Sequence, residues 1–139
     1  MVHRVVNCMA IALGERHSVS MKTHKSLEAW REARQVAVLV IASARTDWRP
    51  WAAALFSQLL RASLSVQLNI AEGATFGRSP TYTRHLAIAY GSAVETGELL
   101  ELLRDAGVLR PATAATLLSH SERCRWLLIG LLKRHRPMA

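Results

Sequence analysis

Aromatic residues are scarce in this chain, at 6% of 139 residues, although half of the residues are hydrophobic. The hydrophobic residues are mostly Ala, Leu and Val, a composition typical of a helical bundle rather than a β-sandwich. We therefore expect an all-α protein, and the length suits one domain with its own core.

Cysteine is also rare. The two cysteines, Cys8 and Cys124, lie far apart, and no second cysteine stands two to four residues from either of them. Neither the spacing of a zinc site nor a disulfide framework is present, so both are expected to be reduced thiols in a cytoplasmic protein.

Long hydrophobic runs are missing too. Nothing approaches the roughly 20 apolar residues of a membrane span, so no membrane partner is expected. Residues 5–13 are briefly apolar, but Asn7 interrupts them and the flanking residues fit a signal peptide poorly. The sequence predicts a flexible N-terminal extension over residues 1–22 and a bundle domain over residues 23–136.

Acidic residues are few: the chain has 10 acidic and 18 basic residues and a formal net charge of +8. Of the basic residues 15 are arginines, which bind phosphate groups bidentately. A polyanion such as RNA or DNA is therefore a candidate partner. The alternative, a basic protein with no polyanion partner, stays open at this stage.

Four segments carry apolar residues at spacings of three and four, which predicts four amphipathic helices. They are residues 27–44, about 51–72, 80 to about 105, and 111 to about 134. The loops between them are short, which favours antiparallel neighbours and an up-down-up-down four-helix bundle. The positions expected in the core are Leu27, Trp30, Ala33, Ala37, Val40, Ile41 and Ala44 in the first helix, Leu55, Leu59, Ala62, Val66 and Ile70 in the second, Tyr82, Leu86, Ala89, Ala93, Thr96, Leu99, Leu100 and Leu103 in the third, and Leu117, Leu118, Cys124, Leu127, Leu128, Leu131 and Leu132 in the fourth.

Proline and glycine mark the expected helix ends. Pro50, Ser79-Pro80 and Pro111 suit first helical turns. Gly73 is expected to end the second helix in a left-handed cap and Gly107 to end the third. Gly91 lies inside the third helix, where glycine is unfavourable, and it is expected to mark a close approach of another backbone.

Residues 126–132 of the fourth helix are apolar all round. A surface helix needs only one apolar face, so part of this segment is expected to be covered by another subunit of a homo-oligomer.

A polar strip on the second helix is the clearest candidate site. Arg61, Ser65, Asn69 and Glu72 follow one another at spacings of four, four and three. Glu95 and Glu98 of the third helix and Arg78 of the connecting loop are expected near it. Such a set could line a binding pocket, but we interpret it as a structural network that fixes the helix register.

Catalytic patterns are missing from the chain. There is no Glu-x-x-His pair for a di-iron site, and His85 and His120 have no evident nucleophile partner. His85 is expected to be a packed or half-exposed ring. We predict no metal, no cofactor and no enzymatic activity.

Arg61, the run Asn69-Ile70-Ala71-Glu72-Gly73, Arg78, Tyr82 and Gly91-Ser92 together resemble a family pattern. The chain is similar to small bacterial four-helix-bundle proteins encoded by intervening sequences in large-subunit ribosomal RNA genes, and to accessory proteins of diversity-generating retroelements. The resemblance implies a pentamer of bundles that binds nucleic acid or a partner such as a reverse transcriptase. It departs at Leu60, where relatives often have a second Arg, and at His85, where they usually have an aromatic residue. The matching positions, with no established catalytic role in the family, are Arg61, Asn69, Glu72, Gly73, Gly91, Ser92 and Glu95.

The leading hypothesis is a non-enzymatic oligomer whose basic surface binds nucleic acid or a nucleic-acid-processing partner. The competing hypothesis is a scaffolding oligomer that binds other proteins through the fourth helix without nucleic acid. The candidate nucleic-acid contacts are Arg31, Arg34, Arg45, Arg49, Arg78, Arg84, Arg123, Arg125, Lys133, Arg134 and Arg136.

Overall fold

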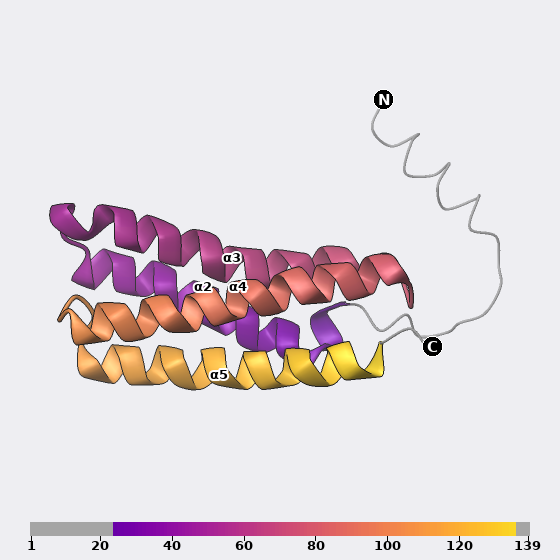
Figure 1. Ribbon diagram of the computed structural model, residues 1–139. Coiled ribbons are helices and arrows are strands. Elements are labelled where there is room, and N and C mark those ends of the chain that lie inside the picture. The colour runs from indigo at the N-terminus through magenta and orange to yellow at the C-terminus, as the bar shows by residue number, and fades with distance from the viewer. Residues whose placement is uncertain (1–23, 136–139) are drawn as a thin grey trace, which may run out of the picture.

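The computed structural model describes residues 24–135, and this part of the chain contains four long α-helices and no strand (Figure 1). The helices are α2 (Glu28–Asp47), α3 (Ala53–Ala74), α4 (Pro80–Asp105) and α5 (Pro111–Arg134), with short 3₁₀ turns η1 (His24–Ser26) and η2 (Pro50–Ala52). The all-α prediction is confirmed. The predicted extension over residues 1–22, Cys8 and Arg136 lie outside the described residues.

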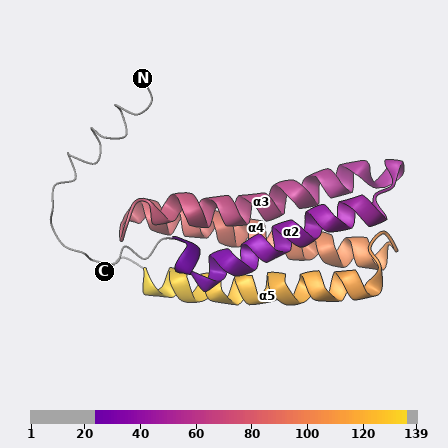
Figure 2. The same cartoon turned by 180° about the vertical axis from the view of Figure 1, so that it is seen from behind.

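Each helix packs against two others. α3 contacts α2 and α4, and α5 contacts α4 and α2. In Figure 1 the α2–α3 and α4–α5 connections lie at one end of the molecule and the α3–α4 connection at the other. Figure 2, seen from behind, shows α2 between α3 and α5. In the described part of the chain, no helix combines the length and apolar character that a bilayer span requires.

Local sequence signals set most of the helix ends. The Ser79 side chain accepts a hydrogen bond from the backbone N–H of Tyr82, and Pro80 follows as the first helical residue of α4. Pro111 likewise begins α5. Gly107 has a φ of 72° just after α4 ends, as predicted.

The left-handed cap was assigned to the wrong glycine. Gly73 is still helical, α3 continues to Ala74, and it is Gly77 that adopts a positive φ of 60°. The reason for a glycine at position 73 is close packing against α4, described below.

The core consists of two hydrophobic clusters, one in each half of the bundle. One is centred on Ile70, Leu86 and Leu128, and the other on Leu59, Leu100 and Leu117. Four small polar residues, Ser43, Ser63, Thr96 and Ser121, are also buried. Ser63 and Thr96 donate hydrogen bonds to carbonyls of their own helices, which satisfies their hydroxyl groups.

Most predicted core positions are buried, but Ile41 is not. Its side chain is 46% exposed, while Val36 and Val40 on the same helix are buried. The buried face of α2 is therefore rotated away from Ile41. On α5, Leu128 and Leu131 are buried and Trp126 is 62% exposed, so the outward part of the apolar segment is uncovered within the single chain.

Candidate functional site

The predicted polar strip forms a chain of hydrogen bonds between α3 and α4. The hydroxyl oxygens of Ser65 and Ser92 lie 2.7 Å apart. The Asn69 amide donates to the Ser65 carbonyl at 2.9 Å, and its Oδ1 lies 3.0 Å from Nδ1 of His85. These four half-buried side chains cross-link two helices, as expected for groups that fix helix register.

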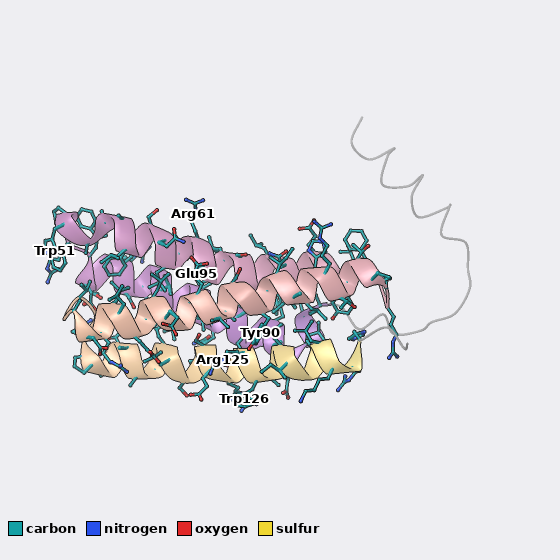
Figure 3. All side chains as sticks on the ribbon, in the orientation of Figure 1. Trp51, Arg61, Tyr90, Glu95, Arg125 and Trp126 are labelled. Carbon is teal, nitrogen blue, oxygen red and sulfur yellow. The ribbon has the colours of Figure 1, made fainter. Side chains whose placement is uncertain are left out.

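The charged members of the strip do not join this chain. Arg61 is exposed, points away from the bundle in Figure 3, and forms no ion pair with any described residue. Glu72 is exposed, and Glu95 accepts a hydrogen bond from the Gln58 amide instead. The expected Arg–carboxylate network is therefore wrong. The spacing placed the short side chains correctly, but Arg61 lies at the outer edge of the strip and extends into solvent.

Gly73 lies where α3 packs closely against α4. A Cβ atom at this position would lie 2.6 Å from the Cβ of His85. The His85 ring is half-buried, as predicted, and it stacks on Phe76 with centroids 5.6 Å apart. Gly91, by contrast, is exposed, and a Cβ there would meet nothing within 4 Å. The prediction that another backbone approaches Gly91 closely is wrong for the single chain. The position at which close packing requires a glycine is Gly73.

A cluster of charges between α2 and α5 was missed from the sequence. Glu32 lies 2.6 Å from Nδ1 of His120 and 3.1 Å from Nε of Arg123, and Glu28 lies 3.8 Å from Arg123. These residues are about 90 positions apart in sequence. No local spacing rule connects them, so only the helix order could have revealed the cluster.

Asp47 forms an ion pair with a residue that is far away in the sequence. It is the last residue of α2, is 5% exposed, and lies 3.0 Å from Nε of Arg110. The backbone N–H of Arg110 also donates to it, and the Arg110 guanidinium donates to the Thr46 hydroxyl. The α2–α3 connection is thereby tied to the α4–α5 connection.

At the opposite end, α5 is tied to the start of α4. The Arg78 guanidinium donates to the Arg134 carbonyl, and the Thr83 hydroxyl donates to the His135 carbonyl, each at 3.0 Å. The His135 ring packs edge-on against Tyr82. Burial and then the positive charges of Arg78 and Arg134 lower the pKa of His135, while burial raises the pKa of Tyr82.

Basic side chains gather at both ends of the bundle, and most have no carboxylate partner among the described residues. Arg78 and Arg134 meet at one end, with Arg84 on the second turn of α4. Arg45 and Arg49 lie at the other end, while Arg31 and Arg34 are exposed on α2. No contact joins these groups into one patch. The arginines that do form ion pairs are Arg104, Arg110 and Arg123.

A polar groove of about 290 Å³ lies between α4 and α5. Glu98, Glu101 and Glu122 line it together with Arg104 and Arg125. The two signs of charge largely offset one another, and Figure 3 shows Arg125 between the two helices. This groove is therefore not part of the basic surface.

The described titratable groups offer little for catalysis or metal binding. Residues 24–135 contain no group of three or more His, Cys, Asp or Glu placed to hold a metal ion. Cys124 donates a hydrogen bond to the Ala29 carbonyl, and burial, assisted by the charge of Glu32, raises the pKa of its thiol to about 12. The thiol therefore stays protonated at neutral pH and is a poor nucleophile.

The fold and these contacts define a class: a small all-helical protein with hydrogen bonds and ion pairs between its helices and with mostly positive unpaired charge. The chain belongs to the 23S rRNA-intervening sequence protein family, whose model matches residues 25–130. It is also similar to the crystal structure of a protein of unknown function from the S23 ribosomal protein family of Bacteroides thetaiotaomicron. That likeness has a TM-score of 0.68 and 24% sequence identity and covers 76% of this chain and 95% of the other, which shows a shared fold. No curated protein matches the chain.

Proposed function

We propose that this protein is a non-enzymatic, cytoplasmic homo-oligomer of antiparallel up-down-up-down bundles, a pentamer, whose basic surface binds nucleic acid. A nucleic-acid-processing enzyme such as a reverse transcriptase is a further partner of that surface. The observation that carries the proposal is the excess of exposed arginines without a carboxylate partner in the described residues.

Charge pairing supports a phosphate-binding role. Arg104, Arg110 and Arg123 are compensated by Asp105, Asp47 and the pair Glu28 and Glu32. Most of the remaining arginines of residues 24–135 are exposed and form no ion pair within these residues, although Arg125 shares a groove with three glutamates. Guanidinium groups that are free of internal ion pairs can bind phosphate without first breaking a contact.

Exposed apolar area supports the oligomer. Trp126 is 62% exposed on the outer face of α5 and points away from the bundle in Figure 3. Contiguous exposed apolar patches often mark a contact surface, and the half-buried Leu127 and Ile129 belong to the same apolar segment of α5 as Trp126. In a ring every subunit repeats the same basic ends, so modest local charges add to a strong collective field.

A salt series tests the nucleic-acid part. Affinity for RNA is expected to fall as salt rises, and Arg84→Gln is expected to reduce the log–log slope by about 1, since one phosphate contact is lost. Arg104→Gln, which removes the same charge from a residue paired with Asp105, is the matched control and should leave the slope nearly unchanged. Absence of RNA binding at low salt, or binding that is indifferent to salt, contradicts the proposal.

Sedimentation tests the oligomer. A stable species of about five times the 15.4 kDa chain mass is expected at micromolar concentration. A lone protomer under these conditions contradicts this part of the proposal.

The competing function is a scaffold that binds other proteins through α5 without nucleic acid. The shallow surface formed by Trp126 with Ser119, Glu122, Arg123 and Leu127 favours it. If a pull-down after nuclease treatment returns a defined protein that Trp126→Ala loses, and RNA binding is absent, the scaffold is the better account.

A further inference from the structure

Two exposed tryptophans flank an arginine at the end of the bundle where α2 meets α3. Residues 45–51 read Arg-Thr-Asp-Trp-Arg-Pro-Trp. Trp48 is 46% exposed and Trp51 69% exposed, the highest exposure among the large hydrophobic side chains of the described residues. Arg45 and Arg49 are exposed beside them. We call Arg45, Trp48, Arg49 and Trp51 the indole end, and Figure 3 shows Trp51 projecting from it.

The backbone of the indole end is held in place from both sides. Asp47, which lies between the two arginines in the sequence, is buried against Arg110. Its carboxylate accepts a hydrogen bond from the backbone N–H of Arg110. On the other side Ala52 is fully buried and donates its backbone N–H to the Arg49 carbonyl at 2.9 Å. The indoles are therefore presented by an ordered segment, which lowers the entropy cost of binding.

The charge of the indole end is uncompensated. Asp47 is the only carboxylate within residues 45–51 and is already paired with Arg110. Neither Arg45 nor Arg49 forms an ion pair within residues 24–135, and the Arg49 guanidinium donates only to the Trp48 carbonyl. A polyanion is attracted to such a surface, whereas a second copy of this basic chain is not, unless it presents carboxylates there.

A groove of about 470 Å³ adjoins the indole end between α2 and α3. Ile41, Ala44 and Ala53 contribute an apolar lining, and Arg45 and Trp48 stand on its edge. Its volume falls in the range of sites that accept small planar ligands. An apolar floor beside an indole and a guanidinium suits an unstacked nucleobase with its phosphate.

We propose that the indole end binds single-stranded nucleic acid. Bases stack on Trp51 and Trp48, and Arg45 and Arg49 bind the phosphates on either side. Every base has a π face, so such stacking tolerates any sequence but requires bases that are not paired. This inference rests on the proposed function and assigns it a site and a substrate class. The arginines were candidates from the sequence, but the tryptophans were not.

The test uses the full chain and an unstructured RNA oligomer of about 12 nucleotides, with a hairpin of the same composition as the paired control. Trp51→Ala and Trp48→Ala are each expected to weaken single-strand binding about 5- to 150-fold, the range for loss of one stacked base, and to change hairpin binding little. Trp51→Phe, which keeps an aromatic face, is expected to recover most of the loss. Leu68→Ala is the control, since it removes a large apolar side chain that is 58% exposed on α3 and has no part in the proposed oligomer contact.

The outcomes separate this inference from the proposed function. If the wild-type chain binds no RNA at any salt, both fail. If it binds RNA with the expected salt dependence but both tryptophan variants bind like wild type, or Leu68→Ala loses as much affinity, only the indole end is wrong. Loss of oligomer mass in Trp51→Ala, without loss of RNA affinity, likewise overturns it by assigning the surface to self-association.

Discussion

Gly73→Ala is expected to destabilise the protein because the added methyl group meets α4. The new Cβ would lie 2.6 Å from the Cβ of His85 and 3.0 Å from Cδ2 of Tyr82. The His85 Cβ is attached directly to the helix backbone, so relief requires α3 and α4 to move apart. Overpacking of this kind costs about 1–3 kcal/mol. The propensity gain from Gly to Ala is at most about 1 kcal/mol and applies to helix interiors, so the packing cost should win in the last turn of α3.

Gly91→Ala provides the control, because it makes the same chemical change in open space. The free energy of unfolding of this variant should equal that of the wild type or exceed it by up to about 1 kcal/mol. Both are measured by urea denaturation followed by helical circular dichroism at one fixed protein concentration, since the stability of an oligomer depends on concentration. The reasoning is refuted if Gly73→Ala proves as stable as Gly91→Ala.

Two further changes probe buried polar groups. Asp47→Asn should lower the free energy of unfolding by about 1–3 kcal/mol because it weakens the contacts to Arg110. Asp105→Asn, which alters an exposed ion pair, should change the free energy of unfolding by less than about 0.5 kcal/mol. Urea titration of both variants measures the difference. The pKa of Cys124 is raised in the folded state, so stability is complete below the unfolded value of 9.0 and is lost as pH rises toward about 12, because the unfolded thiol ionises first. Cys124→Ala should make this alkaline loss shallower, with the remainder due to groups such as Tyr82, whose pKa burial also raises.

Each of these two predictions has a result that would contradict it. Equal stability of the Asp47→Asn and Asp105→Asn variants would mean that the Asp47–Arg110 contact contributes no more than an exposed pair. An alkaline stability profile that is unchanged by Cys124→Ala would mean that this thiol ionises equally well in the folded and unfolded chains.

Features governed by neighbours in sequence were predictable. The Ser79 cap and the end of α4 before Gly107 depend on the preferences of a few adjacent residues, and both occur as expected. The apolar periodicity also placed most of the buried positions of α3 and α4. These signals act within one helix, so they predict local structure without knowledge of how the helices pack.

Features governed by the partner helix were not predictable. Gly73 and Gly91 are both glycines in helical sequence, and only the packing of α4 on α3 distinguishes them. Ile41 fits the apolar spacing of α2, but the rotation of that helix leaves it exposed. The partners of Asp47 and Glu32 lie more than 60 residues away, in helices whose relative placement the sequence does not encode locally.

The contacts that hold the final turn of α5 against the start of α4 also fix where the described chain ends. Residues 24 and 135 lie at one end of the molecule, and Trp51 lies at the other (Figures 1 and 3). A helix of 20 residues such as α2 spans about 30 Å. A fluorophore or an affinity handle attached at residue 24 or residue 135 would therefore lie roughly that far from Trp48 and Trp51. Immobilised in this way, the protein should still present its tryptophans to solution, which suits surface-based measurements of ligand capture.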